Sequence, residues 1–381
     1  MHEGLGRYPG LYGFRVPRLP ALVSRSAPGR STTPQVLLCL IALSSPPGRA
    51  DAAPPGDVVV LPGIGRYRVR VLPNPPRYVC SAAAISDTGT VCGTASPGPP
   101  RRTLLRRPVV WSPAGVPRLL LDVGVSSDGL GTGPHGPVVG AGGYGCRMSS
   151  AFATVGARTR ALPLPWPWPG AATDANASGV IVGYYTEPGH EEQPCVWRPH
   201  RVGRRLPVLH LYGKANGISA RGQIVGEAWT KDGAMHAVSW SRGMLTDLGA
   251  PKGGGARAVG VNSAGCIVGS THWPDGSWRA TTWLAGRAHY LSTPVDADSY
   301  ANAIGWRGVV AGEVEQRNPP DGYACLWVSG KAVPVRVVRH GALVLKIDSA
   351  VDINSRGDVL CNAGYAGDLG RGAYLVLERI R

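Results

Sequence analysis

Pairs of glycines four residues apart recur down this chain at a nearly constant interval. The first glycines of six pairs lie 47, 43, 43, 43 and 43 residues apart, and Gly357 begins a seventh copy with Cys361 as its second member. A tryptophan column keeps the same step, with Thr154 in the second repeat and Val376 in the last. A period near 43 residues is typical of β-propellers, in which each repeat forms one four-stranded blade. The glycines are Gly89, Gly136, Gly179, Gly222, Gly265, Gly308 and Gly357, and the tryptophans are Trp111, Trp197, Trp240, Trp283 and Trp327.

The fourth repeat shows most clearly how one unit predicts four strands. Alternating residues run from Ala215 to Ile218, and Gly222 then allows a tight turn into a second strand because glycine adopts positive φ without steric cost. Ser219, three residues before that glycine, is of a type that caps turns through its side-chain oxygen. A third strand ends at Trp240, and a second tight turn at Gly243 leads to the fourth strand, Leu245–Leu248. We find no sustained helical periodicity after residue 60.

The two ends of the repeat array are complementary. The last repeat stops near Leu377 without a full fourth strand, and one strand without a partner, Tyr67–Leu72, precedes the first repeat. We therefore predict an all-β, seven-bladed propeller in which the N-terminal strand completes the last blade, because such closure leaves no long exposed sheet edge. The expected divisions are an N-terminal extension with a signal peptide over residues 1–52, a linker over 53–65 and the propeller over 66–381.

The repeat unit resembles a known family. The pattern Ala-x-x-Ile-Asn/Ser-x-x-Gly-x-Ile-Val-Gly, followed by Ala-x-x-Trp and Leu-x-x-Leu, is similar to the HAF repeat of predicted extracellular bacterial proteins. The likeness covers about residues 82–377 and departs from the pattern at Thr154, Val376 and Cys361. It implies a secreted propeller-like domain, and it implies no catalytic residues and no cofactor.

The N-terminal segment has the pattern of a secretory signal peptide. An apolar stretch, Val36–Leu43, is too short to span a bilayer, follows Arg25 and Arg30, and precedes an Ala-x-Ala sequence ending at Ala52. We expect a secreted or periplasmic protein without a membrane span in the mature chain. A tail with a chance apolar patch is the alternative.

The composition narrows the classes of partner. The formal net charge is +16, which favours anionic partners in principle. No run of Arg or Lys exceeds two residues and no nucleic-acid motif occurs, so we expect arginines on solvated faces and no nucleic-acid partner. The spacing of His, Cys and Asp predicts no metal site and no cofactor. We read Cys195 and Cys325 as buried apolar residues and leave a Cys92–Cys361 disulfide open.

The loops differ between the two ends of the predicted propeller. First-to-second and third-to-fourth turns are short, whereas second-to-third and fourth-to-first connections vary in length and share one end. Binding residues usually lie on such variable loops of a rigid frame. Aromatic and basic residues there are candidates for stacking on sugar rings or anchoring a protein; packing under their own loops is the alternative. The candidates are Trp166, Trp168, Tyr184, Tyr185, Trp229, Trp273, Trp278, Arg106, Arg107 and Lys231.

The sequence therefore predicts a monomeric binding or interaction module whose partner is an extracellular glycan or a protein. One alternative is a polysaccharide lyase or glycoside hydrolase with its site at the mouth of the central channel. Such an enzyme needs converging carboxylates, for which the candidates are Asp174, Glu187, Glu191, Asp298 and Asp352. The other alternative is a structural surface protein without a specific ligand.

Overall fold

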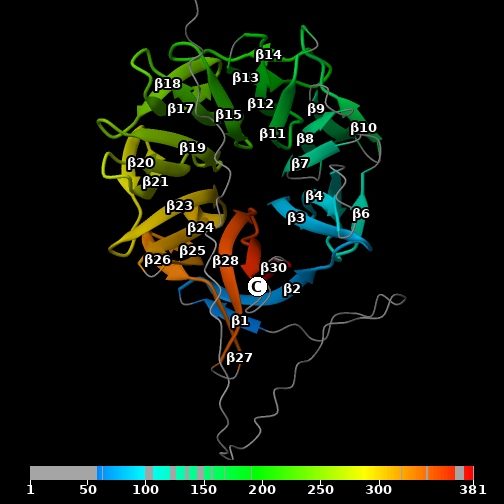
Figure 1. Cartoon of the computed structure of the whole chain (residues 1–381), viewed down its shortest axis with the longest axis vertical. Coiled ribbons are helices and arrows are strands. Elements are labelled where there is room, and N and C mark those ends of the chain that lie inside the picture. The colour runs from blue at the N-terminus through cyan, green and yellow to red at the C-terminus, as the bar shows by residue number, and fades with distance from the viewer. Residues whose placement is uncertain are drawn as a thin grey trace, which may run out of the picture. The chain divides into compact units, whose positions relative to one another are not determined.

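The strands that the repeats predict form seven blades around one axis (Figure 1). The computed structural model describes residues 58–61, 63–98, 106–120, 126–133, 137–143, 150–155, 158–166, 168–189, 191–318, 320–339, 342–364 and 373–380. The predicted seven-bladed β-propeller is confirmed, and residues 53–381 form one compact unit. The predicted extension, residues 1–52, lies outside the described residues. In the described part, no helix is long and apolar enough to cross a membrane.

Blades 1 to 6 are four-stranded antiparallel sheets in which the strands follow sequence order. Blade 1 contains β3 (Tyr78–Ile85), β4 (Val91–Pro97), β5 (Arg107–Trp111) and β6 (Pro117–Leu119). Blade 2 contains β7 (Ser126–Thr132), β8 (Val138–Gly143), β9 (Ser150–Val155) and β10 (Arg158–Ala161). Blade 3 contains β11 (Gly170–Ala175), β12 (Ile181–Thr186), β13 (Glu192–Trp197) and β14 (Arg204–Arg205).

The later blades continue the pattern. Blade 4 contains β15 (Gly213–Ile218), β16 (Ile224–Trp229), β17 (Met235–Ser241) and β18 (Met244–Gly249). Blade 5 contains β19 (Gly255–Val261), β20 (Ile267–His272), β21 (Trp278–Leu284) and β22 (Arg287–Tyr290). Blade 6 contains β23 (Ala297–Ile304), a 3-10 turn η1 (Trp306–Gly308), β24 (Val310–Arg317), β25 (Pro320–Val328) and β26 (Lys331–Pro334).

Blade 7 takes strands from both ends of the chain. The C-terminal part supplies β27 (Arg336–Arg339), β28 (Ala342–Ile353), β29 (Val359–Gly364) and β30 (Ala373–Ile380), and the N-terminal part supplies β1 (Val58–Leu61) and β2 (Gly65–Leu72). β2 pairs with β30 from Arg66–Ile380 to Leu72–Tyr374, so the N-terminal strand completes the last blade as predicted. The linker prediction for residues 53–65 was wrong in part, because β1 pairs with β2 and buries Val59 and Leu61 against the core.

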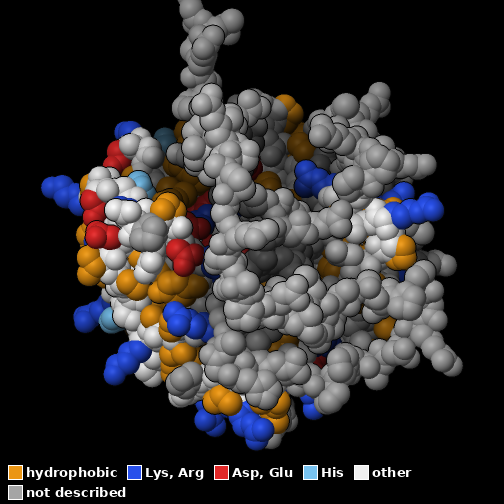
Figure 2. All heavy atoms as spheres, turned by 60° about the horizontal axis from the view of Figure 1, so that its bottom comes forward, with side chains coloured by type: hydrophobic (Ala, Val, Ile, Leu, Met, Phe, Trp, Pro, Cys, Tyr) orange, Lys and Arg blue, Asp and Glu red, His pale blue; other side chains and the backbone are white. Residues whose placement is uncertain are grey.

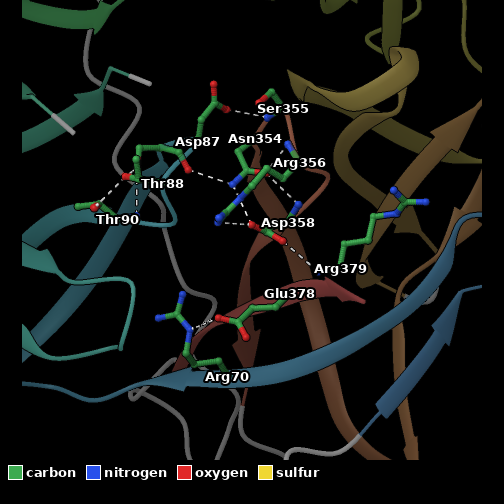
Figure 3. A network of polar contacts seen from close by, with 11 residues as sticks. Arg70, Asp87, Thr88, Thr90, Asn354, Ser355, Arg356, Asp358, Glu378 and Arg379 are labelled. Atoms are coloured by element: carbon green, nitrogen blue, oxygen red, sulfur yellow. Dashed lines mark hydrogen bonds and ion pairs between the residues drawn. The ribbon is translucent and has the colours of Figure 1, made fainter. Parts of the chain in front are cut away.

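Side-chain hydrogen bonds also join blade 7 to blade 1 (Figure 3). The Asp352 carboxylate accepts hydrogen bonds from the backbone N–H of Ile85, 2.8 Å away, and of its neighbour Ile353. Asn354 donates its side-chain amide to the Ser86 carbonyl at 2.9 Å. Across β2 and β30, the Arg70 guanidinium lies 2.6 Å from the Glu378 carboxylate. The ring is therefore closed by polar contacts as well as by strand pairing.

In the repeats whose glycine turns the structure describes, the two glycines have different structural roles. The first lies at the tight turn with positive φ, for example 81° at Gly222 and 72° at Gly179, and the turn caps act as expected: the Ser219 hydroxyl accepts the Gln223 N–H at 3.1 Å. The second packs against the neighbouring strand, since a Cβ on Gly226 would lie 1.9 Å from the Lys214 carbonyl oxygen. Blade 7, which has Cys361 at this position, has an additional register shift between Ile347 and Ser349.

The repeated tryptophans lie between the blades. All five are at most 1% exposed. Each of four indoles donates its Nε1–H to a carbonyl in the connection that enters its blade: Trp111 to Pro73, Trp197 to Pro163, Trp240 to Pro207 and Trp327 to Ser292, at 2.7–3.0 Å. In blade 2 the Thr154 hydroxyl instead accepts a hydrogen bond from the Val138 N–H. In these four blades the column thus fixes the blade to the incoming chain, in addition to filling the core.

Cys195 and Cys325 are buried apolar residues, as the sequence predicts. Cys195 and Cys325 are fully buried, and burial raises the pKa of each thiol to about 12. Cys92 and Cys361 are free thiols, so the disulfide that the sequence left open is not formed. Their blades are neighbours, but Cys92 packs with Val138 of blade 2, whereas Cys361 packs with residues of blade 6, and the two side chains belong to different core clusters.

Candidate functional site

Two columns of the repeat vary in chemistry while their neighbours stay constant. The first column is the residue that precedes the buried alanine on the innermost strand of a blade. The second column is the residue that follows the second glycine on the next strand, where it pairs with the first-column residue. Lys214 pairs with Glu227, Tyr300 pairs with Glu313, and Ala171 pairs with Tyr184. These positions lie towards the end of the ring that carries the second-to-third and fourth-to-first connections. A constant frame with chemically variable positions is the arrangement expected of a binding surface.

Residues of these columns in blades 3 to 6 join with two third-strand residues, Glu192 and Trp278, into one cluster, which we call the arc. It consists of Tyr184, Glu192, Lys214, Glu227, Arg257, Trp278, Tyr300 and Glu313. Lys214 of blade 4 forms an ion pair of 3.0 Å with Glu192 of blade 3. Glu227 interacts electrostatically with both Lys214 and Arg257, and Arg257 also interacts with Glu313. Acidic and cationic side chains therefore alternate along the arc.

Aromatic rings interleave with these charges. The Lys214 ammonium lies 5.1 Å from the Tyr184 ring centroid, and the Arg257 guanidinium lies 5.5 Å from that of Trp278. Trp278 also contacts Tyr300, with the ring centroids 5.8 Å apart. These five side chains are partly exposed, whereas Glu227 is buried. In Figure 2, acidic and hydrophobic side chains lie next to one another at the left, where Figure 1 places blades 4 to 6.

Burial changes the proton affinity of the acidic groups in the arc. Desolvation raises the pKa of Glu227, against the lowering effect of Lys214 and Arg257, and it raises the pKa of Glu313 against a hydrogen bond from Ser349. Burial alone would lower the pKa of Lys214, but the hydrogen bond to Glu192 and the nearby charges outweigh it and raise the pKa. The arc therefore offers carboxyl groups that are easier to protonate than usual, beside fixed cations.

The structure brings only two of the predicted binding residues, Tyr184 and Trp278, into the arc. Trp168 stacks on Tyr185 at 5.4 Å and packs against the core of blade 3. Trp166, by contrast, is 60% exposed.

The other predicted binding residues lie apart from the arc. Trp229 contacts Tyr212, and Trp273 lies against Tyr290 with the Arg279 guanidinium 4.4 Å from its ring centroid, so both aromatics contact their own surroundings. Lys231 is exposed in the loop between β16 and β17. Arg106 and Arg107 lie at the start of β5 in blade 1, outside the four blades of the arc.

Among the carboxylates that the sequence suggested for an enzyme, Asp174 and Asp352 interact electrostatically, and each is held by backbone hydrogen bonds. Asp174 accepts hydrogen bonds from the backbone N–H of Ile218 in the next blade and of Ala175, as Asp352 does at the ring closure. Asp298 forms an ion pair of 2.6 Å with Arg317. Glu187 accepts a hydrogen bond from the Tyr185 hydroxyl, and Glu191 lies in the connection between β12 and β13.

Sequence reasoning missed Glu192, Lys214, Glu227, Arg257, Tyr300 and Glu313. For all of them except Glu192, the available signal was the pair of variable columns beside the constant alanine and glycine. Reading the repeats for what differs between them would have found these residues.

Asp174 and Asp352 predict a pH dependence of stability. Burial raises the pKa of Asp174 to about 7 and that of Asp352 to about 6, although backbone hydrogen bonds oppose the shift. In the unfolded chain both titrate near 3.8, so the folded state holds more protons between about pH 4 and 7. The free energy of unfolding should therefore fall as the pH rises through this window and level off above it, by up to about 1.4 kcal/mol per pH unit for each carboxyl.

Urea unfolding of the wild type and of the double variant Asp174→Asn, Asp352→Asn, from pH 4.5 to 8, measures this effect. The variant should lose stability less steeply with rising pH. If the free energy of unfolding falls with pH equally steeply in the two proteins, these carboxyls do not titrate as described.

The comparisons with known proteins agree on the fold. The sequence matches no protein-family model and no curated protein. Among solved structures, the β-propeller domain of the Trilobed protease from Pyrococcus furiosus is similar with a TM-score of 0.57 and 10% identity over 79% of this chain and 93% of that one. A puromycin-hydrolyzing peptidase from Mycobacterium tuberculosis has a TM-score of 0.51 and 11% identity, over 80% of this chain and 53% of that one. The structure of YCF48 bound to D1 peptide has a TM-score of 0.50 and 12% identity, over 86% of this chain and 100% of that one. At such low identity these likenesses establish the propeller fold alone.

Proposed function

We propose that this chain is a secreted carbohydrate-binding propeller whose ligand occupies the arc. The observation that carries the proposal is the alternation of partly exposed aromatic rings with charged hydrogen-bonding groups on four consecutive blades. A sugar ring presents a C–H face that packs on an aromatic ring and hydroxyl pairs that bind carboxylates and guanidinium groups. The signal-peptide pattern of residues 1–52 and the HAF-repeat resemblance support an extracellular location.

A protein partner is the competing ligand for the same surface. The arc mixes Lys214 and Arg257 with three glutamates, so its own charges nearly cancel, and the aromatics are single rings instead of one continuous apolar patch. Protein interfaces depend on a desolvated core of large apolar side chains. The dispersed, polar character of the arc therefore favours a hydroxyl-rich ligand.

Glycan-array and polysaccharide pull-down experiments with the purified protein test the proposal. We expect Trp278→Ala to weaken binding by about 1–3 kcal/mol, the range found for loss of a stacking ring in nucleic-acid complexes. Arg257→Lys should also weaken binding because an ammonium cannot reproduce the bidentate contact. The matched control Arg287→Lys changes an exposed arginine at the other end of blade 5 and should bind like the wild type. Glycan binding that survives both arc substitutions would remove the arc as the site.

A polysaccharide-cleaving enzyme is a second candidate, favoured by the raised pKa values of Glu227 and Glu313 on either side of Arg257. Release of new reducing ends or unsaturated products from a bound polysaccharide separates the two functions. An enzyme would lose product release in Glu227→Gln or Glu313→Gln while still binding the polymer. A pure binding module would release no product even as the wild type.

A further inference from the structure

A pocket of about 410 Å³ lies between blades 3 and 4 at the end of the ring opposite the arc. Its floor is apolar and buried, formed by Val196 and Leu206 from blade 3 and by Ile224 and Trp240 from blade 4. The first-to-second turn of blade 4, at Gly222, borders it. Its volume falls within the range of small-molecule sites, which is about 300–1,000 Å³.

A local departure of blade 3 from the repeat produces this pocket. Blades 4 and 5 join their third and fourth strands through two-residue turns, in which Arg242-Gly243 and Ala285-Gly286 have positive φ. In blade 3 the longer connection 198–203 takes their place, and its fourth strand, β14, is only two residues long. The connection is pinned at Gly203, where a Cβ would come within 2.5 Å of the Trp197 indole nitrogen. The shortened outer strand leaves the gap towards blade 4 uncovered.

Arginines surround the opening of the pocket. Arg198, Arg201 and Arg204 come from blade 3, and Arg242 comes from the third-to-fourth turn of blade 4; all four are exposed. Arg205 also borders the pocket, but β14 alternates its side chains, and Arg205 interacts with Tyr185 on the other face of blade 3. The pocket has no acidic residue in its lining. Within the described residues, none of the four arginines forms an ion pair with a carboxylate.

We propose that this pocket binds a small organic anion that has an apolar body and carboxylate or phosphate groups. Four guanidinium groups around one opening repel each other in the free protein, and an anion removes that repulsion while accepting bidentate hydrogen bonds. The apolar floor selects an organic ligand over a bare inorganic ion, because it rewards the burial of a hydrocarbon group. The site is separate from the arc and does not depend on the function proposed for it.

Calorimetric titration of the full chain with four probes tests this site. 1-Naphthyl phosphate and isophthalate carry the two oxyanion types on an aromatic body, and 1-naphthol and isophthalamide are their neutral counterparts. We expect saturable 1:1 binding of at least one anion, weakening as the salt concentration rises from 50 to 300 mM, and no binding of its neutral counterpart. The two anions show whether phosphate or carboxylate is preferred. Absence of binding by both anions, or equal binding of the neutral probes, would overturn the proposal.

The double variant Arg204→Ala, Arg242→Ala should raise the dissociation constant for the binding anion at least about tenfold, through the loss of charge-assisted hydrogen bonds. Arg204→Lys, Arg242→Lys, which keeps the charge but not the planar fork, should lie between this variant and the wild type. Arg287→Ala, at the matching end of blade 5, should bind within about twofold of the wild type, whereas loss equal to that of the double variant would indicate only a general charge effect. Melting temperatures of the free variants establish that each is folded.

Discussion

Deleting residues 66–73 will prevent the ring from closing and will leave a protein that aggregates or melts far below the wild type. The deletion removes β2, which pairs with β30 over seven residues and buries Tyr67 and Leu72 in two core clusters. Each large buried side chain alone contributes about 2–5 kcal/mol, and the deletion also exposes the edge of β30 to other chains. Scanning calorimetry and size-exclusion chromatography measure both effects.

Two controls isolate the closure. Deleting residues 1–52 should leave the melting temperature unchanged, because β1 and β2 are retained. A synthetic peptide of residues 58–73 should restore solubility and raise the melting temperature of the deleted protein by adding the strand in trans. A deleted protein that melts at the wild-type temperature would show that β2 does not close the ring.

Replacing Trp240 by alanine should cost about 3–5 kcal/mol of the free energy of unfolding, the usual range for truncation of a buried aromatic residue. The ring is 1% exposed, lies in the core cluster that joins blades 3 and 4, and donates a hydrogen bond of 2.7 Å to the Pro207 carbonyl. Its loss leaves a cavity and removes the hydrogen-bond donor of the Pro207 carbonyl.

Trp229→Ala is the matched comparison, since this ring is partly exposed and contacts Tyr212 beside a loop. Trp229→Ala should lower the free energy of unfolding by clearly less than Trp240→Ala does. Denaturant unfolding of both variants gives the difference, and equal midpoints would contradict the distinction between column and loop tryptophans.

The repeat period made the architecture predictable because two positions in it strongly favour glycine. Only glycine adopts the positive φ of the first turn easily, and only the second glycine, such as Gly226, fits against the carbonyl of the neighbouring strand. The missing strand at one end and the extra strand at the other then required closure. β1 was missed because Val58–Leu61 is a short run beside Pro62 and Gly63, which together resemble a linker.

The arc and the arginine pocket were harder to predict for a different reason. Both arise where one repeat differs from another: the arc from variable positions such as Lys214 and Arg257, and the pocket from the longer connection 198–203 in blade 3. Periodicity describes what repeats have in common, so it does not report these differences. Residues from separate blades also meet only once the ring has formed, as Glu192 and Lys214 do.

Hydrogen–deuterium exchange of the full chain, with and without the glycan that binds best on the array, locates the bound glycan on the propeller. Occupancy of the arc predicts slower exchange in the loops that flank it, Trp229–Met235 and Thr271–Trp278, while exchange in the turns 219–223 and 241–243 stays unchanged. Protection confined to those turns, at the opposite end of the ring, would show that the glycan does not bind at the arc.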